Sequence, residues 1–284
     1  MLTKAVPFVI AALIAVGGVS GQTADRVFHV AYAGTAQDLA EMAAAVRRIT
    51  DIERASVDTE RSRLALRGTE GQVALGEWLI HQFDQPTDRE AFARRSQDSS
   101  PHEYRLTGSG DDVVGVFYLA HAETVQELQE ITIVVNSLGS MRRMYTYNPP
   151  RAVVVRDTAE QVRLAGWLVH ELDKPANQPE SQDSDAHEYK LTSGRDYVVR
   201  LFYLKHAETF QDFQEVYTLV RAAIRIRWAF AYYTPRAVAC RGTPDQIALA
   251  EWLFHELDQP GGQEGVAQPH EYKLSGSEED AARV

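Results

Sequence analysis

Residues 151–175 read RAVVVRDTAEQVRLAGWLVHELDKP, and the chain contains two further versions of this stretch. Residues 62–86 read SRLALRGTEGQVALGEWLIHQFDQP, and residues 236–260 read RAVACRGTPDQIALAEWLFHELDQP. Each version opens with a β-type apolar run, continues with apolar residues at helical spacing and ends in a proline. Such internal repetition predicts three small domains of the same fold.

The helix inside each version is predicted to begin at a threonine that has a glutamine three residues later. This is the amide form of the capping box, in which each side chain bonds a backbone N–H of the other residue. The predicted helix caps are Thr69, Thr158 and Thr243. The apolar stripe of this helix is predicted to be buried, with one tryptophan per repeat filling the small core. These core residues are Leu75, Leu164, Leu249, Trp78, Trp167 and Trp252.

Each repeat also has elements upstream of the quoted stretch. Val27–Tyr32 is a β-type run, and it is followed by a helix predicted to begin near Thr35. Met144–Tyr147 and Trp228–Tyr232 are typical of strands, and the proline-containing segments after them favour hairpin turns. The resulting order in each repeat is β-α-β-β-α, which is an α+β fold.

A short phrase follows the polar linker after each repeat, namely His102-Glu-Tyr-Arg-Leu, His187-Glu-Tyr-Lys-Leu and His270-Glu-Tyr-Lys-Leu. Its alternating polarity predicts a strand. Because no copy precedes the first repeat and one follows the third, we assign this trailing strand to the preceding repeat. The alternative is a hairpin with the strand that follows. The predicted domains are 22–106, 107–191 and 192–274 on flexible linkers, with a disordered tail at 275–284.

Residues 1–21 are typical of a signal peptide. Lys4 gives a positive start, Ala5–Val16 is apolar but short for a membrane span, and small residues follow at 17–21. Cleavage is expected after Gly21 or Ala24, and an uncleaved anchor is the alternative. The mature chain is therefore expected to be periplasmic or secreted, without insertion into the membrane.

The segments Val114–Leu119, Thr124–Val135 and Pro150–Pro175 together resemble the short N-terminal repeat domain of bacterial secretins. Residues 199–260 look like the same module, and residues 27–86 do so more loosely. The motif Leu-Asp-x-Pro at residues 172–175 and 257–260 carries much of the resemblance. It implies a KH-like βαββα fold, periplasmic rings below an outer-membrane pore and contacts with other envelope components. The strands of a pore-forming domain are absent after Pro260, so pore formation is not expected.

The composition is 44% hydrophobic and 24% charged, and the formal net charge is −11. This acidic balance argues against nucleic-acid partners, which need a basic surface. The segment Gly68-Thr69-Glu70-Gly71 has the GxxG letters of an RNA-binding KH loop, but it carries an acid and occurs in one repeat only. RNA binding is therefore not expected.

Motifs for catalysis are missing from the sequence. It contains no phosphate-binding loop, no GxSxG elbow and no HExxH pair. Most of the histidines recur at equivalent places (His81, His170 and His255; His102, His187 and His270; His121 and His206), which leaves a metal-dependent envelope enzyme as the alternative function. The single cysteine, Cys240, is expected to be a small buried residue, with an intermolecular disulfide as the other option.

The sequence thus favours an exported, non-catalytic protein-interaction or assembly module of the bacterial cell envelope. Its partners are expected to be envelope proteins or further copies of itself, with no cofactor, metal or small-molecule ligand. A ring-forming relative of the secretins is a second alternative. Tyrosines on the hairpin strands are the candidate partner contacts, because their rings combine apolar area with a polar tip. These residues are Tyr145, Tyr147, Tyr232 and Tyr233.

Overall fold

A computed structural model of the chain describes residues 23–88, 90, 102–106, 111–174, 187–192, 197–233, 236–260, 271–273 and 281–283. The expected signal peptide and most of the polar linkers lie outside these residues. In the described part, each repeat has the expected β-α-β-β-α order, and the mixed α+β fold is confirmed. None of its helices combines the length and apolar content needed to cross a membrane.

The elements of the three repeats correspond one to one. The first repeat contains β1 (Thr23–His29), α1 (Ala36–Thr50), β2 (Arg54–Asp58), β3 (Arg63–Thr69) and α2 (Glu70–Phe83). The second contains β5 (Asp112–Tyr118), α4 (Val125–Gly139), β6 (Arg143–Tyr147), β7 (Ala152–Thr158) and α5 (Ala159–Leu172). The third contains β9 (Val198–Tyr203), α6 (Phe210–Ile224), β10 (Trp228–Tyr232), β11 (Ala237–Gly242) and α7 (Pro244–Leu257). The repeated phrase forms β4 (His102–Arg105), β8 (Glu188–Lys190) and β12 (Glu271–Lys273), and β13 (Ala281–Arg283) follows.

The threonines singled out as caps lie at the starts of the second helices. At α2, Thr69 Oγ1 accepts a hydrogen bond from the Gln72 backbone N–H at 3.3 Å, and Gln72 Oε1 accepts one from the Thr69 N–H at 3.0 Å. The same reciprocal pair occurs at Thr243 in α7. At α5, Thr158 Oγ1 accepts from the Gln161 N–H at 3.3 Å. These bonds satisfy donors that the first turn of a helix leaves free.

The strands form small antiparallel sheets. The orders are β1-β3-β2, β4-β5-β7-β6 and β10-β11-β9-β8. The phrase strand pairs with the first strand of the repeat that follows it, with Tyr104 opposite Val114 and Tyr189 opposite Val199. The assignment of the phrase to the preceding repeat is therefore wrong, and the hairpin alternative is right. The apolar strands β5 and β9 offer an antiparallel edge a few residues downstream, which short-range pairing favours.

After the third repeat, β12 pairs instead with β13, with Tyr272 opposite Ala282. The strand β13 lies inside the stretch 275–284 that was expected to be a disordered tail. This short hairpin gives the last copy of the phrase a pairing partner within the chain.

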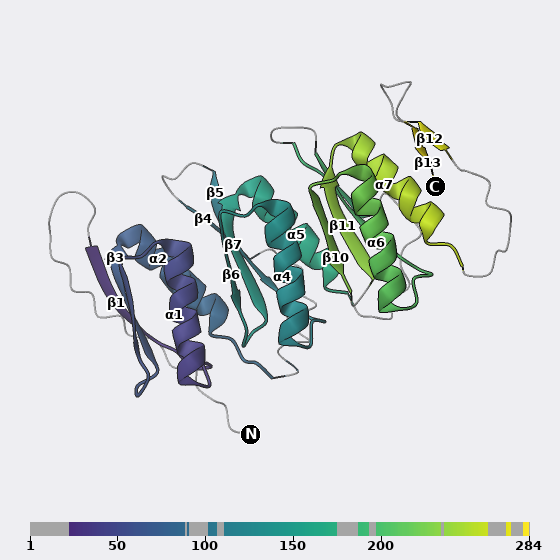
Figure 1. Ribbon diagram of the computed structural model, residues 1–284. Coiled ribbons are helices and arrows are strands. Elements are labelled where there is room, and N and C mark those ends of the chain that lie inside the picture. The colour runs from purple at the N-terminus through teal and green to yellow at the C-terminus, as the bar shows by residue number, and fades with distance from the viewer. Residues whose placement is uncertain are drawn as a thin grey trace. The chain divides into compact units, whose positions relative to one another are not determined.

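The chain divides into two compact units. The first comprises residues 1–128 and 141–162, and the second comprises residues 129–140 and 163–284. In the first unit, α1 and α2 cover one face of the sheet β1-β3-β2, and the sheet β4-β5-β7-β6 lies on their other side (Figure 1). One core joins all of these elements, including Val114, Val116 and Val154 of the second repeat. In place of an independent domain on a flexible linker, the first repeat thus shares a core with strands of the next.

In the second unit, α6 and α7 cover one face of the sheet β10-β11-β9-β8 (Figure 1). The core between them contains Phe213, Val238 and Cys240. Burial raises the pKa of the Cys240 thiol to about 12, so the native protein holds it as an unreactive thiol. The expected domain boundaries at 106/107 and 191/192 stay a prediction.

Candidate functional site: the inter-repeat interfaces

In the first unit, α1 and α2 contact the sheet β4-β5-β7-β6 across a surface here called the first inter-repeat interface. Aromatic rings form its apolar part. Phe83 of α2 and Tyr147 of β6 pack with their ring centroids 4.8 Å apart. Trp78 of α2 and Tyr104 of β4 lie 5.5 Å apart. Tilted ring pairs at these distances add to the energy of burial.

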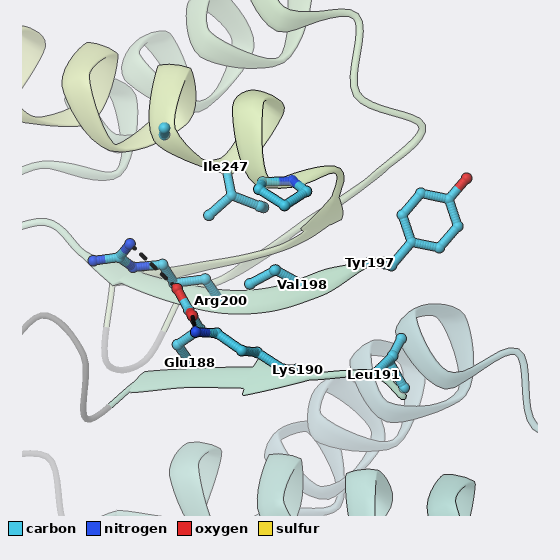
Figure 2. Close-up of a pocket in the computed structure, with 9 residues that line it drawn as sticks. Glu188, Lys190, Leu191, Tyr197, Val198, Arg200 and Ile247 are labelled. Atoms are coloured by element: carbon cyan, nitrogen blue, oxygen red, sulfur yellow. Dashed lines mark hydrogen bonds and ion pairs between the residues drawn. The ribbon is translucent and has the colours of Figure 1, made fainter. Parts of the chain in front are cut away.

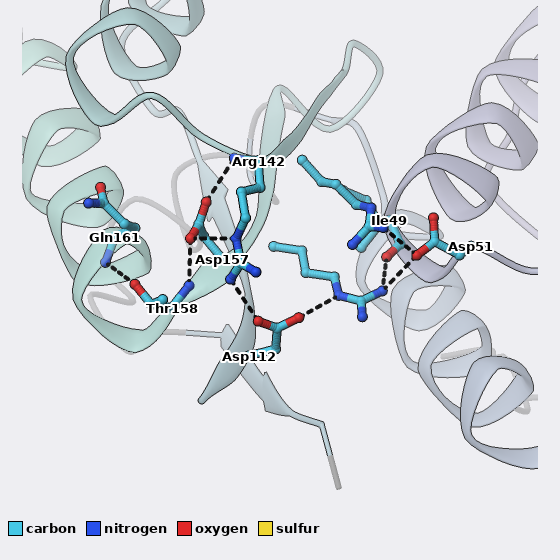
Figure 3. A network of polar contacts seen from close by, with 9 residues as sticks. Ile49, Asp51, Asp112, Arg142, Asp157, Thr158 and Gln161 are labelled. Carbon is cyan, nitrogen blue, oxygen red and sulfur yellow. Dashed lines mark hydrogen bonds and ion pairs between the residues drawn. The ribbon is translucent and has the colours of Figure 1, made fainter. Parts of the chain in front are cut away.

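Side chains of the sheet also bond backbone carbonyls at the helix ends. The Tyr118 hydroxyl donates to the Gln82 carbonyl at 2.6 Å, in the last turn of α2. Arg156 Nη1 donates to the Ile49 carbonyl at 2.9 Å, in the last turn of α1 (Figure 3). The last carbonyls of a helix have no partner within it and lie at the negative end of its dipole. The interface therefore supplies hydrogen-bond donors to carbonyls at the C-terminal ends of α1 and α2.

A network of carboxylates and arginines surrounds this contact (Figure 3). Arg142 bonds the buried Asp157 through Nε at 3.0 Å and Asp112 through Nη2 at 2.7 Å. The hydrogen bonds to Asp112 and Asp157 raise the pKa of the Arg142 guanidinium. Arg156 Nε lies 3.4 Å from the other oxygen of Asp112, and Arg143 Nη2 lies 2.6 Å from Asp51 just after α1. These charges are mutually paired, which suits them to orienting the helices and the sheet relative to one another.

A second inter-repeat interface, between the ends of α4 and α5 and the sheet β10-β11-β9-β8, has the same contacts at equivalent positions. Arg241 Nη1 donates to the Leu138 carbonyl at 2.6 Å, as Arg156 does to Ile49. The Tyr203 hydroxyl donates to the Glu171 carbonyl at 3.0 Å, as Tyr118 does to Gln82. Trp167 and Tyr189 lie 5.6 Å apart, as Trp78 and Tyr104 do at 5.5 Å. One mode of binding, sheet face onto helix pair, is thus used twice.

The second interface has one addition, a polar cluster around the buried carboxylate of Glu171. His187 Nδ1 lies 2.7 Å from Glu171 Oε2, and Lys174 Nζ donates to the same oxygen at 2.7 Å. Both His187 and Glu171 are buried. The cluster ties the start of the phrase strand to the end of α5.

The aspartate of the Leu-Asp-x-Pro motif at residues 257–260 has a structural role, and Asp84 in Phe83-Asp84-Gln85-Pro86 has the same role in the first repeat. Asp258 Oδ1 accepts from the N–H groups of His206 at 2.9 Å and Ala207 at 3.0 Å, and Oδ2 accepts from that of Lys205 at 2.5 Å. Asp84 accepts in the same way from the N–H groups of Ala31 and Tyr32. The carboxylate therefore fixes the loop before the first helix to the end of the second helix.

An open cavity of about 490 Å³ lies between β8, β9 and the start of α7 (Figure 2). Leu191, Val198 and Ile247 supply much of its apolar wall. Arg200, one of the charged residues that line it, is paired with Glu251 at 2.6 Å and approaches Glu188 at 3.5 Å. Glu188 also pairs with Lys190 of the same wall at 3.4 Å, so Arg200, Glu188 and Lys190 all take part in ion pairs.

The recurrent histidines do not come together in the described part of the chain. His81, His170 and His255 are exposed near the ends of their helices, and His121 is exposed in a loop. His102 packs edge-on against Tyr118 with centroids 5.3 Å apart. His270 lies outside the described residues. No group of three or more potential metal-ligating side chains occurs among the residues described.

The predicted partner tyrosines occupy different environments from those expected. Tyr147 and Tyr232 are buried, so they are not available as exposed contacts, and this corrects the expectation. Tyr145 and Tyr233 are half-buried; Tyr233 accepts a hydrogen bond from Gln214 Nε2 and packs near Phe213. The hairpin tyrosines face inward because their strands have a packed surface on both sides.

The leucines and tryptophans singled out as core residues also differ from one another. Leu75, Leu164 and Leu249 are buried. Trp78, Trp167 and Trp252 are half-buried. Trp78 and Trp167 also pack against the tyrosine of the strand ahead of the next repeat, Tyr104 and Tyr189. Their place in the sequence, immediately before a buried apolar pair, did not distinguish these roles.

Arg156 and Arg241 were missed by sequence reasoning. A signal for them exists, since both follow the apolar run of the quoted stretch at the same position. A charged residue repeated at the end of a buried strand indicates a specific acceptor nearby, although the acceptor itself is a backbone carbonyl, which sequence patterns do not reveal.

Comparison with known proteins returns structures only: no family model and no curated protein matches the chain. Solved secretin chains are among the structures to which it is similar. The ExeD chain of Aeromonas hydrophila has 16% identity and a TM-score of 0.19, covering 84% of this chain, which spans 42% of that one. The N-terminal domain of the secretin XcpQ from Pseudomonas aeruginosa has 13% identity and a TM-score of 0.22, covering 58% and 71% of the two chains. Dim2p from Pyrococcus horikoshii has 10% identity and a TM-score of 0.29, covering 55% and 93%.

Proposed function

We propose that this chain is a non-catalytic protein-interaction and assembly module, exported to the bacterial cell envelope. The observation that carries the proposal is the repeated use of one interface. In both interfaces, an arginine and a tyrosine of a sheet bond carbonyls at the ends of two helices, and a tryptophan packs on the phrase tyrosine. Surfaces that recognise one another through equivalent contacts are what an assembly module requires.

The distribution of charge supports binding rather than catalysis. Asp157, Glu171 and Arg200 are buried, and each bonds an oppositely charged or hydrogen-bonding side chain. Removing one partner of such a buried pair lowers the stability of the protein, because the other charge is left buried and unpaired. Pairs of this kind favour specific contact between surfaces. The export signal at residues 1–21 and the sequence resemblance to secretin N-terminal domains favour the envelope as the place of assembly.

The proposal is tested by following the full chain, tagged at its C-terminus, in a Gram-negative host. We expect the tagged protein in the periplasmic fraction with its N-terminus at residue 22 or 25. Replacing Leu13 and Ile14 with arginine should retain it, uncleaved, in the cytoplasm, because the apolar segment is interrupted. Cross-linking in intact cells should then link the exported protein to envelope proteins or to itself. A cytoplasmic wild-type protein, or a purified protein with stoichiometric metal and hydrolytic activity, would contradict the proposal.

A further inference from the structure

The first sheet differs from the other two at one edge. In the second and third sheets, the phrase strands β4 and β8 lie outside β5 and β9. In the first sheet, the described residues provide three strands in the order β1-β3-β2, so β1 is an edge strand. An exposed edge of this kind can accept a further strand by backbone hydrogen bonding.

The outer face of the same sheet is also exposed. Val27 of β1 is 54% exposed, whereas Val116 and Leu201 at the equivalent positions of β5 and β9 are 1% and 3% exposed. The side chain of Arg67, which corresponds to Arg156 and Arg241, is 50% exposed, compared with 11% for Arg156. Val27 and Arg67 of the first repeat therefore lie uncovered, whereas a helix pair covers the equivalent residues of the other repeats. His29 occupies the position of Tyr118 and Tyr203.

The third repeat shows the complementary pattern on its first helix. Leu219 of α6 is 57% exposed. The equivalent Ala45 in α1 and Val134 in α4 are 0% and 2% exposed. Phe210 at the start of α6 is exposed as well. The position equivalent to Phe210 in α4, Val125, is exposed too, so the difference between the repeats lies at Leu219. A large apolar side chain that is exposed where the other repeats are buried indicates a further binding surface.

The chain also has a surplus phrase strand, β12, beyond the last repeat. In the third sheet, β8 pairs with β9 so that Glu188 lies opposite Arg200 and Lys190 opposite Val198. Arg26 of β1 occupies the position of Arg200, since Arg-Val-Phe and Arg-Leu-Phe align. Arg26 also pairs with Glu77 of α2 at 2.5 Å, just as Arg200 pairs with Glu251 of α7 at 2.6 Å.

We propose that two copies of this chain associate head to tail, with β12 of one copy added to the edge of β1 in the other. In the register of β8 on β9, Glu271 lies opposite Arg26 and Lys273 opposite Ala24. The exposed face of α6 then packs on the outer face of the sheet β1-β3-β2, covering Leu219 and Val27. This inference names the partner of the proposed assembly module and rests on that function.

A second copy fits these surfaces because the contact continues an interface that the chain already makes twice. The third repeat and the segment after it supply the helix α6 and the strand β12 with Glu271. The first repeat supplies Arg26, which would lie opposite Glu271. Because the two surfaces are different, the contact is heterologous, and repeating it produces a ring or an open chain of copies.

The strand β13 competes with this association. It pairs with β12 so that Glu271 lies opposite Arg283, which is the same glutamate–arginine relationship as Glu188 with Arg200. Residues 281–283 read Ala-Ala-Arg, and residues 24–26 of β1 read Ala-Asp-Arg. Within one chain, β13 therefore takes the place on β12 that β1 of another copy would take. Removing β13 should free β12 and favour association between copies.

The test uses the mature full-length protein in sedimentation equilibrium over a range of concentrations. We expect wild type to self-associate, and a variant ending at residue 274 to associate at least tenfold more tightly. Val27→Glu and Leu219→Glu should each be monomeric. Their mixture should form dimers and nothing larger, because each variant retains one intact surface. Ile133→Glu, at an equally exposed position of α4 (57%), is the matched control and should behave as wild type.

The register is tested by mixing an Ala24→Cys variant with a Lys273→Cys variant under oxidation. A disulfide-linked dimer is expected, and His29→Cys mixed with Lys273→Cys should remain unlinked. Two results would overturn the inference: a wild type and a truncated chain that both stay monomeric, or mixed Val27→Glu and Leu219→Glu variants that do not dimerise. A monomeric protein that still cross-links to envelope proteins in cells would refute the head-to-tail contact alone and leave the proposed function intact.

Discussion

Replacing Tyr147 with alanine tests whether the first repeat and the sheet of the second share one core. Tyr147 is buried, and its ring packs 4.8 Å from that of Phe83, which belongs to the first repeat. Truncating a fully buried aromatic side chain costs about 3–5 kcal/mol of stability, because transfer energy is lost and a cavity is left. Up to about 1.5 kcal/mol of this loss comes from the ring pair itself.

The assay is urea unfolding of the full chain followed by far-ultraviolet circular dichroism. Tyr147→Ala should lower the unfolding midpoint of the first unit strongly. Tyr147→Phe, which keeps the ring, should lose about 1.5 kcal/mol or less. Tyr32→Ala is the matched control, since Tyr32 belongs to the same unit and is exposed, and it should change stability by less than about 0.5 kcal/mol. A loss below about 1 kcal/mol for Tyr147→Ala would refute a shared core.

Three further outcomes are expected. Asp258→Ala should lower the free energy of unfolding by about 1–3 kcal/mol, measured by heat or urea, because three backbone N–H groups lose a charged acceptor. Asp245→Ala, at an exposed acid in the first turn of α7, is the comparison variant. Arg225→Gly should raise the unfolding free energy by about 1 kcal/mol, because Arg225 has a φ of 47° after α6, a conformation that glycine adopts without strain; an unchanged or lower stability would contradict this. Cys240 should resist thiol reagents at pH 8 in the native state and react fully in denaturant. Burial raises the pKa of the Cys240 thiol from 9.0 to about 12. The stability that this proton contributes to the folded state is therefore complete below pH 9 and is lost as the pH rises towards 12. Wild type should lose more stability over that range than Cys240→Ala.

Much of the fold follows directly from the sequence. The threonine–glutamine spacing predicted where α2, α5 and α7 begin, because a capping box is a local arrangement. The order β-α-β-β-α follows from apolar periodicity in the same way. Pairing of the phrase strand did not follow, since the same alternation fits either neighbouring repeat. Only the structure shows that Tyr104 lies opposite Val114 and that the strand joins the next sheet.

The candidate site was harder to predict than the fold. Tyr145 and Tyr147 were expected to be exposed, because a hairpin on a small sheet ordinarily has one face in water. Here the second face is covered by helices of another repeat, which is a property of tertiary packing. Arg156 bonds a backbone carbonyl of Ile49, and a carbonyl has no signature in a sequence. The sequence shows that the arginine recurs at 156 and 241, but it does not predict which group the arginine bonds.

Hydrogen–deuterium exchange of the full-length protein tests the shared core most directly. If α1 and the strands β5 and β7 belong to one core, their slowest amides should exchange with the same opening free energy and lose protection together as urea is added. Protection that disappears from α1 while β5 and β7 remain fully protected would show that the first repeat folds by itself and would contradict the account.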